Sequence, residues 1–398
     1  MASYSKYALI LGPLVMIGPV SIDMYLPALP TIASEFRVDQ GAAQMTLTAY
    51  FIAVGLSQII YGPLSDAFGR RPPMLGGLVL YVLASLGCAF APSIEWLIAF
   101  RFMQGVGAAS SMVIARAIVR DLLRGHEATR LMALMMLVIS LAPMLAPLIG
   151  SFLIEPFGWR SVFFAVMTVA ALDIFIVLFV LKETRPPELR EPLSFKRMRT
   201  TYGRLLQDPG FMGLTMIGGF GMASFFSFLA SASFIYIDHF GLTPTQFALG
   251  FAFNAVGFFG MSQMASNFGK RFGMHRVVRG ATLAYASGMT LLFVLTLAGA
   301  DNFYLLAGLL FVSYAFLGLV IPTATVLSLE ENGAVAGSAS ALSGTLQTVS
   351  GAIAMTVGAT IFDGTLLPMV LMIFICAFSA FVLSLVTVKP LGPTEAMA

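Results

Sequence analysis

A succession of long apolar segments separated by short polar ones constrains this chain more than any other feature. Each segment is close to the roughly 20 residues that a helix needs to cross the hydrocarbon core of a bilayer. They lie at residues 7–27, 43–62, 74–92, 95–115, 131–154, 162–181, 211–236, 246–265, 277–298, 303–327, 333–361 and 365–388. Only 10% of the 398 residues are charged, against about 25% in a soluble domain. We therefore expect an all-α membrane protein with twelve transmembrane helices.

The basic residues fall on one side of the membrane once the N-terminus is placed in the cytoplasm. Two of the 22 then lie outside, Arg37 and Arg160, and Arg101 lies within a span. The cytoplasmic side receives Lys6, Arg70, Arg71, Arg116, Arg120, Arg124, Arg130, Lys182, Arg185, Arg190, Lys196, Arg197, Arg199, Arg204, Lys270, Arg271, Arg276, Arg279 and Lys389. This positive-inside bias predicts that both termini are cytoplasmic. Because topology explains the net charge of +3, we expect no nucleic-acid partner.

The cysteines and histidines give no pattern typical of a disulfide framework or a metal site. Cys88 and Cys376 both lie inside apolar runs. His126, His239 and His275 are far apart, and none has a second ligand at a helical or hairpin spacing. We therefore expect that the protein binds no metal ion and no cofactor.

The longest polar segment, residues 182–209, falls near the middle of the chain. It divides an N-terminal bundle of six helices at 1–181 from a C-terminal bundle at 210–398. Short sequences also recur between the halves: Phe51–Gly55 matches Phe253–Gly257 at an offset of 202, and Phe68–Arg71 matches Phe268–Arg271 at an offset of 200. We interpret the halves as pseudo-symmetric repeats, an arrangement that places the substrate site of many transporters between them.

The link between the second and third spans carries a dense motif, Gly62-Pro-Leu-Ser-Asp66-Ala-Phe-Gly69-Arg70-Arg71. Glycines permit a tight backbone turn, and an aspartate is stabilised when it faces the N-terminus of another helix. The alternative is a plain turn with topology-setting arginines, which would not require Asp66.

A carboxylate interrupts the first span, in Ser21-Ile-Asp23-Met-Tyr25-Leu-Pro27-Ala-Leu-Pro30. A charge there costs about 2.5 to 3.5 kcal/mol on insertion scales and is a functional candidate. Desolvation favours the neutral form, which suits a proton carrier. The alternative is an interfacial residue that snorkels or caps the break before Pro27.

Two further patterns lie in the fourth and fifth spans. Arg101-Phe-Met-Gln104-Gly105-Val-Gly107-Ala-Ala109 places a permanently charged guanidinium beside small residues that let another helix approach. The alternative is that Arg101 has a structural role and connects two neighbouring helices. The fifth span contains two prolines that bend a helix, in Ala142-Pro143-Met-Leu-Ala146-Pro147-Leu-Ile-Gly150-Ser151. We expect this segment to make close contact with the eighth span.

Asp173, in the sixth span, matches no motif and could face lipid-accessible water or pair with a neighbour.

Together these four patterns resemble the major facilitator superfamily, in particular its bacterial bicyclomycin/chloramphenicol-resistance (Bcr/CflA) exporters. The resemblance implies a drug:proton antiporter of the bacterial inner membrane in which Asp23 carries the coupling proton and Arg101 assists through hydrogen bonds toward the first helix. It also implies that Asp66 meets the start of the eleventh span, near Gly333 to Gly337, and that Arg70 and Asp121 complete a cluster that locks the outward-open state. Pro143, Pro147 and Gly150 correspond to the family's antiporter motif, although Ala146 and Ser151 replace two of its glycines.

The substrate side is predicted by helix position alone. Aromatic and polar residues in several spans suit an apolar, promiscuous pocket for a small drug-like molecule. The candidates are Tyr25, Tyr50, Phe225, Phe226, Asn254 and Gln347. A proton-coupled transporter of a small metabolite, importing or exporting, is the alternative. We find no catalytic or nucleotide-binding motif, so we expect no enzyme, and we expect a monomer whose partners are substrate, protons and membrane lipid.

Overall fold

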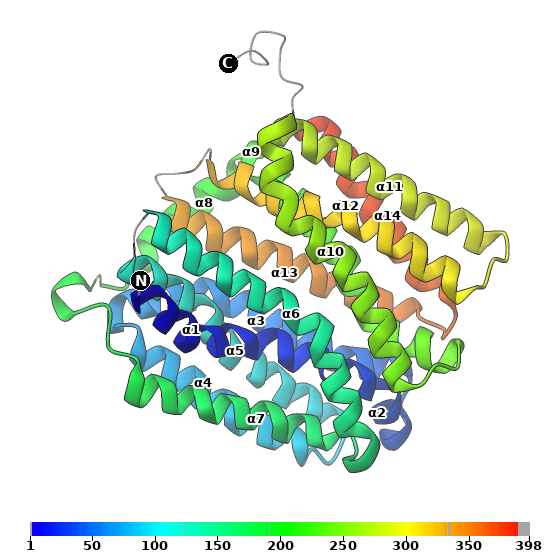
Figure 1. Ribbon diagram of the computed structural model, residues 1–398, viewed down its shortest axis with the longest axis horizontal. Helices are drawn as coiled ribbons and strands as arrows, with labels where there is room; N and C mark the ends of the chain where they lie inside the picture. Colours follow the sequence, from blue (N-terminus) through cyan, green and yellow to red (C-terminus); the bar gives the residue numbers. More distant parts are fainter. Residues whose placement is uncertain (1, 124, 191, 331, 333–334, 389–398) are drawn as a thin grey trace, which may run out of the picture. The chain divides into compact units, whose positions relative to one another are not determined.

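The computed structural model describes residues 2–123, 125–190, 192–330, 332 and 335–388, and within these ranges it is helical and contains no strand (Figure 1). The α-helices of the N-terminal half are α1 (Ala2–Asp23), α2 (Leu29–Phe36), α3 (Gln40–Phe68), α4 (Arg71–Ala89), α5 (Ile94–Leu122), α6 (Gly125–Phe157) and α7 (Arg160–Phe175). Those that follow are α8 (Phe195–Gln207), α9 (Pro209–Ser233), α10 (Pro244–Phe272), α11 (Met274–Leu297), α12 (Phe303–Glu330), α13 (Ala336–Ile361) and α14 (Leu366–Thr387). Short 3₁₀ and π segments are η1 (Leu26–Ala28), η2 (Ile176–Val180), η3 (Pro187–Leu189) and η4 (Phe234–His239).

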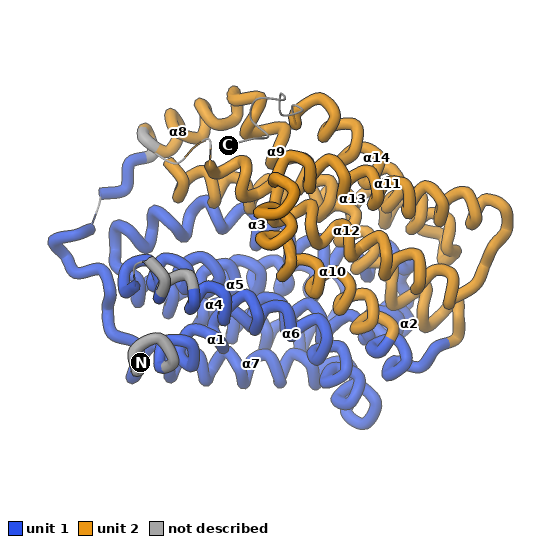
Figure 2. The backbone as a smooth tube through the Cα atoms, turned by 45° about the horizontal axis from the view of Figure 1, so that its top comes forward, with its two compact units in different colours: residues 1–195, 242–249 blue, residues 196–241, 250–398 orange. Residues whose placement is uncertain are grey.

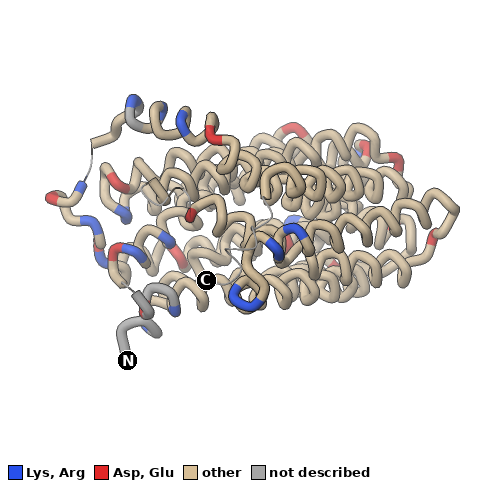
Figure 3. Tube along the Cα trace, turned by 90° about the horizontal axis from the view of Figure 1, so that it is seen from above, with Lys and Arg blue, Asp and Glu red and all other residues tan. Residues whose placement is uncertain are grey.

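Each of the twelve predicted segments coincides with a long helix, so the predicted fold class is confirmed. Among the described residues, eleven helical segments are long and apolar enough to cross a membrane. The twelfth, α13, has 26 residues, enough for about 39 Å of helix, but its serines, threonines and glutamine lower its hydropathy. Lys, Arg, Asp and Glu gather at helix ends and in connections, with long uncharged stretches between them (Figure 3).

The chain divides into two compact units (Figure 2). Unit 1 comprises residues 1–195 and 242–249, and unit 2 comprises residues 196–241 and 250–398. In unit 1, α1 packs against α5 and α6, and α4 packs against α5 and α7. In unit 2, α9 packs against α12 and α13, and α11 packs against α12 and α14. The same order of helix pairs therefore occurs in both units, as expected for a duplicated six-helix arrangement.

The register of this duplication differs from the one that the short sequence matches predict. Helices α3 and α10 each have 29 residues, and both their first and last residues are 204 positions apart. Helix α3 ends at Phe68 and turns at Gly69, with φ +91°, whereas α10 ends at Phe272 and turns at Gly273, with φ +82°. The offset of 200 predicted for Phe268–Arg271 is therefore wrong, because these residues lie within the last turn or so of α10.

Helix α8 lies in the second half of the predicted linker, residues 182–209. It is amphipathic, and its buried Leu205 packs in a cluster with Phe211, Ala339 and Leu342 of unit 2. Residue Asp208 then caps α9 by accepting hydrogen bonds from the amides of Gly210 and Phe211. The last part of the predicted linker is thus a surface helix that is attached to unit 2.

Candidate functional site

Helix α1 ends at the first candidate residue, Asp23. Prolines 27 and 30 follow, and the chain continues through the single turn η1 into α2. Both prolines lie in a first helical turn, Pro27 in η1 and Pro30 in α2, where no amide hydrogen is needed for a helical bond. Asp23 is 5% exposed, and in the described part of the chain it forms no ion pair with Arg101. The predicted capping role for Asp23 is not observed.

Arg101 lies in α5, fully buried, between two tyrosine rings. Its guanidinium carbon is 4.6 Å from the ring centroid of Tyr25 and 4.5 Å from that of Tyr50, well within the range of cation–π attraction. One guanidinium nitrogen, Nη1, donates to the carbonyl of Ser21 at 3.3 Å and to Oε1 of Gln104 at 2.5 Å. The other two, Nε and Nη2, have no hydrogen-bond partner among the described residues. Arg101 is therefore hydrogen-bonded to α1, the helix that ends at Asp23, and still has two guanidinium nitrogens that could donate further hydrogen bonds.

A chain of neutral polar groups extends from this arginine. Gln104 donates to the hydroxyl of Ser85 at 2.7 Å, and that hydroxyl donates to the carbonyl of Tyr81 at 2.7 Å. The hydroxyls of Tyr81 and Ser21 also bond to each other. The network links α1, α4 and α5 and returns to the turn of α1 that carries Asp23. Sequence reasoning missed Ser21, Tyr81 and Ser85 as network members, because hydroxyl side chains within apolar spans give no distinctive local signal.

The prolines of α6 lie inside one continuous helix of 33 residues. One turn after Pro147, Gly150 packs directly against the backbone of Met24, so closely that a side-chain carbon would overlap its carbonyl oxygen. Next to it, the hydroxyl of Ser151 is 2.9 Å from the carbonyl of Pro147 and 3.0 Å from that of Pro244 at the start of α10. The motif thus brings α6 against the residue after Asp23 and also reaches α10.

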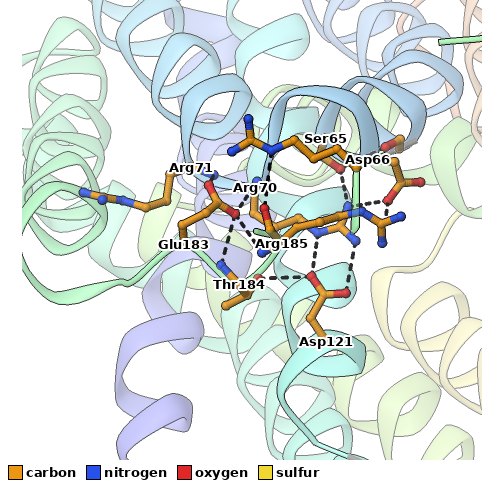
Figure 4. Close-up of polar contacts among 10 residues, drawn as sticks. Ser65, Asp66, Arg70, Arg71, Asp121, Glu183, Thr184 and Arg185 are labelled. Carbon is orange, nitrogen blue, oxygen red and sulfur yellow. Dashed lines mark hydrogen bonds and ion pairs between the residues drawn. The ribbon is translucent and has the colours of Figure 1, made fainter. Parts of the chain in front are cut away.

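The loop between α3 and α4 forms the second cluster, shown in Figure 4. Arg70 is 3% exposed and bonds to Asp121 through Nε at 2.7 Å and Nη2 at 3.1 Å. Its Nη1 bonds to Asp66 at 2.7 Å and to Ser65 at 2.8 Å. Burial alone would lower the pKa of Arg70, but hydrogen bonds and charge from Asp121 and Asp66 outweigh it, so the pKa is raised. Asp66, Arg70 and Asp121 come together as the resemblance implies.

Two other motif residues shape this loop. Gly69 adopts φ +91°, a conformation that residues with a side chain rarely adopt. The carbonyl of Gly62 accepts a hydrogen bond from Ser65 at 2.9 Å. The predicted partner region of Asp66 belongs to unit 2, and its residues 333 and 334 lie outside the described part of the chain. The latch between the units stays a prediction.

Sequence reasoning missed Glu183, which completes the loop cluster. Its carboxylate accepts hydrogen bonds from four backbone amides at 2.8 to 3.0 Å, as Figure 4 shows. These are the amides of Arg70, Arg71, Thr184 and Arg185. Partial burial raises the pKa of Glu183, but the four amides outweigh this effect and lower it. The sequence feature that could have identified Glu183 is its position as a carboxylate among basic residues just after the sixth span.

Arg71 extends the same loop to the end of the sixth span. Its guanidinium donates to the carbonyls of Val177, at 3.1 Å, and Leu178, at 2.8 Å. Both carbonyls belong to the π segment η2. The loop motif therefore holds the last turn of that span as well as the charge cluster.

The predicted substrate residues are divided between the units. Tyr25 and Tyr50 are fully buried and cover Arg101 in this conformation. Tyr25 also bonds to Thr46 at 2.8 Å, and Tyr50 to the carbonyl of Gly18 at 3.4 Å. A substrate role for either tyrosine stays a prediction.

The other four substrate candidates lie in unit 2. Phe225 stacks on Phe258 with ring centroids 5.4 Å apart, and buried Phe226 packs against Gly351. Asn254 donates to the hydroxyl of Tyr236 at 3.1 Å, and its Oδ1 has no partner among the described residues. Gln347 donates to Thr325 and Ser343, each at 3.2 Å. All four side chains are uncharged, and two of them are aromatic.

The cysteines and one histidine have defined surroundings in the structure. Both cysteines are free and buried, and His239 pairs with Asp301 at 2.9 Å. The side chain of His126 lies outside the described residues. Among the described residues, no group of three or more His, Cys, Asp or Glu side chains is placed to hold a metal ion.

The architecture defines a polytopic membrane transporter: a duplicated six-helix arrangement with charged groups buried in one repeat. A model of the Major Facilitator Superfamily matches residues 11–355, and the chain belongs to this family. It is not an enzyme.

Three relatives span almost all of the chain. The chain is 35% identical over 372 residues, 93% of this chain and 92% of the relative, to "Uncharacterized MFS-type transporter YdgK" of Bacillus subtilis. It is 30% identical over 375 residues, 93% of each, to "Bicyclomycin resistance protein homolog" of Haemophilus influenzae. It is also 30% identical over 353 residues, 88% of each, to "Multidrug resistance protein D" of Escherichia coli.

Among solved structures, a D-xylose-proton symporter has the same fold. The TM-score is 0.75 over 99% of both chains, with 17% sequence identity. A likeness at this identity concerns the fold and carries no information on substrate.

Proposed function

We propose that this protein is a proton-coupled antiporter that exports small hydrophobic or amphipathic drugs from the cytoplasm. The observation that carries the proposal is that unit 1 buries two charged groups near the break in α1, Asp23 and Arg101, and that Arg101 donates to the carbonyl of Ser21, two residues before Asp23. A buried ionisable group in a membrane span is costly and marks an ion pathway by default. The names of two relatives, for bicyclomycin and multidrug resistance, support drugs as the substrate class.

The chemistry follows from a carboxyl group that changes its protonation during alternating access. With the cavity open to the cytoplasm, ionised Asp23 and the aromatic walls favour the drug. With the cavity open outward, Asp23 takes a proton and the drug leaves. Coupling is reciprocal, because drug and proton each lower the affinity of the protein for the other.

Arg101 has a supporting part in this scheme. Its guanidinium remains protonated throughout, so it can stabilise the ionised form of Asp23 when the proton is absent. The two nitrogens without partners, Nε and Nη2, provide the donors that such a contact requires. When Asp23 is neutral, the tyrosine rings and Gln104 keep the arginine in place.

The energy available is sufficient for useful export. One proton moving through about 100 mV supplies about 2.3 kcal/mol, and a difference of one pH unit adds about 1.4 kcal/mol. For a neutral drug exchanged against one proton, this sum sustains a concentration ratio of several hundredfold. For a monovalent cation, the voltage terms cancel and only the pH difference drives export.

The positive-inside bias supports an orientation with both termini in the cytoplasm. In this orientation the α3–α4 loop, with Arg70, Asp121 and Glu183, faces the cytoplasm. The bacterial relatives support the inner membrane as the location. We further propose that Asp66 closes a latch against unit 2 in the outward-open state.

Expression in an efflux-deficient bacterium tests the proposed function. We expect higher resistance to chloramphenicol or bicyclomycin, and we expect an uncoupler to raise drug accumulation to the level of cells carrying empty vector. An Asp23→Asn variant of equal abundance is the matched control and should give no resistance. No resistance to any compound of a broad panel, together with uptake of a carbon source, would instead favour a metabolite importer.

A further inference from the structure

A second buried acid, Asp173, has no part in the mechanism above. It lies on α7 in line with Val166, Ala170 and Val177, at spacings that place all four side chains on one face of a helix. All four are buried, and Asp173 is 0% exposed. The prediction that this residue could face lipid-accessible water is therefore wrong, because its face of α7 packs within unit 1.

The predicted alternative, a partner for this carboxylate, is not observed either. Both oxygens of Asp173 lack a hydrogen-bond partner among the described residues. The helices that pack most extensively against α7 are α4, α1 and α6, and the guanidinium carbon of Arg101 on α5 lies 6.0 Å from the ring centroid of Phe163 on α7. Their described titratable or charged residues are Arg71, Tyr81 and Cys88 of α4, Lys6, Tyr7 and Asp23 of α1, and Glu127, Arg130 and Glu155 of α6. None of these side chains forms a hydrogen bond or an ion pair with Asp173.

An ionised carboxylate is strongly disfavoured in such a position. Burial without a counter-charge or hydrogen bonds carries a large desolvation penalty, and a group of this kind binds a proton and becomes neutral instead. We propose that Asp173 is a second proton-binding site of unit 1, distinct from Asp23, which holds its proton at neutral pH as long as α7 keeps the geometry described here.

The segment after Asp173 provides a route for release of this proton. Here α7 changes into the π segment η2, where the amide of Leu181 bonds to the carbonyl of Ile176, five residues back, at 2.9 Å. Such π turns occur often at functional sites. Rewinding a π turn to an α turn shifts the register by one residue and rotates the two flanking parts by about 100° relative to each other.

Arg71 controls this turn, since it donates to the carbonyls of Val177 and Leu178 within η2. Its neighbour Arg70 belongs to the charge cluster of the same loop. Opening of the loop would therefore release η2, loosen the last turn of the span next to Asp173, and let water reach the carboxyl group to take the proton. The use of this proton in drug export rests on the proposed function, but the protonation of Asp173 does not.

Infrared spectroscopy of the full-length protein in proteoliposomes tests the proton-binding site without any substrate. In the Asp23→Asn background at pH 7, we expect a carbonyl stretch from a protonated carboxyl group that disappears in the Asp23→Asn/Asp173→Asn double variant. Asp173→Leu, which fills the apolar position with a side chain of similar size, should remove the same band and guards against misfolding of one variant. A spectrum that is the same with and without Asp173 would overturn the proposal.

Exchange in deuterium oxide tests the release route. The shift of the Asp173 band should appear about tenfold faster or more in Arg71→Ala than in the unmodified protein, because η2 is no longer held. Arg271→Ala, an exposed arginine of unit 2, is the control and should leave the rate unchanged. Equal exchange rates in Arg71→Ala and the control would overturn the gating role of Arg71. Loss of drug export in Asp23→Asn is a separate result, so the proposed function and this inference can fail independently.

Discussion

The two units share an arrangement of helices but not a chemistry. Helices α3 and α10 have the same length and the same offset at both ends, and the order of helix pairs is repeated. All buried charged side chains among the described residues belong to unit 1: Asp23, Arg70, Arg101 and Asp173. The buried polar groups described in unit 2 are all neutral, such as Asn254 and Gln347. One scaffold can therefore hold ionisable groups in one copy and a neutral aromatic interior in the other.

Matched positions sharpen this contrast. With the offset of 204 that relates α3 to α10, Tyr50 corresponds to Asn254. Tyr50 covers a buried guanidinium, whereas Asn254 bonds to a tyrosine hydroxyl. Under the proposed function, this contrast predicts that unit 1 handles the proton and unit 2 contributes neutral contacts for the drug.

The largest effect is expected at Arg101. Arg101→Ala removes a buried cation from between two rings, and we expect drug transport to fall by more than tenfold. Arg101→Lys retains the charge but loses the planar guanidinium that stacks on the rings and its several N–H donors. Drug transport by Arg101→Lys should therefore fall nearly as far. The measurement is drug accumulation in inverted vesicles with an imposed proton gradient. Full activity of Arg101→Lys would show that the stacking geometry is dispensable.

Arg70→Ala should have the next largest effect, on stability. Loss of one partner from a buried ion-pair network costs about 3 to 5 kcal/mol, and the exposure of Asp66 places the expected value at the lower end. Arg271→Ala in unit 2 is the matched control, because Arg271 is exposed and its removal should change stability by less than about 0.5 kcal/mol. Thermal unfolding in detergent gives both values. Similar losses in the two variants would remove the contrast between the units at this loop.

Glu183→Gln should destabilise unit 1 in a manner that depends on pH. The amides lower the pKa of Glu183 in the folded protein, so the stabilisation is present above the ordinary pKa of about 4.5 and disappears as the pH falls through the lowered value. At pH 7 we expect a loss of about 1 kcal/mol, allowing for solvent screening, and almost none at strongly acid pH. Glu188→Gln, at an exposed position nearby, should show no difference at either pH. A pH-independent loss in Glu183→Gln would refute the role assigned to its charge.

The smallest effect is expected from Asn254→Ala. If unit 2 supplies neutral contacts, this variant should change the relative transport of different drugs by a few fold and leave the dependence on external pH unaltered. Transport of chloramphenicol and bicyclomycin across a range of pH values provides the comparison. A shifted pH profile in Asn254→Ala would place part of the proton chemistry in unit 2.

The sequence was sufficient to predict the twelve helices, because apolar length is a local property that the bilayer imposes. It also predicted the cluster of Asp66, Arg70 and Asp121 that the structure contains, whereas the roles of Asp23 and Arg101 in transport stay predictions. Contacts between distant segments were harder to predict. Glu183 meets the amide of Arg70 across 113 positions, and no local pattern encodes that contact.

The register of the repeat was wrong for a related reason. Phe-Gly occurs twice within one turn, at Phe268 and Phe272, and only the second glycine has the positive φ of a turn. The prediction that Asp173 could face lipid-accessible water was wrong because it depended on which face of α7 packs against the other helices. In a span that is apolar all round, the sequence does not distinguish the packed face from the lipid-facing one.

Proton movement during drug transport tests the assignment of the coupling proton to Asp23 most directly. Proteoliposomes that contain a pH-sensitive dye and are given a chloramphenicol gradient should show drug-driven proton flux with the unmodified protein. The Asp23→Asn variant should show none, although it can still exchange drug across the membrane. Drug accumulation by Asp23→Asn against a proton gradient, equal to that of the unmodified protein, would contradict the assignment.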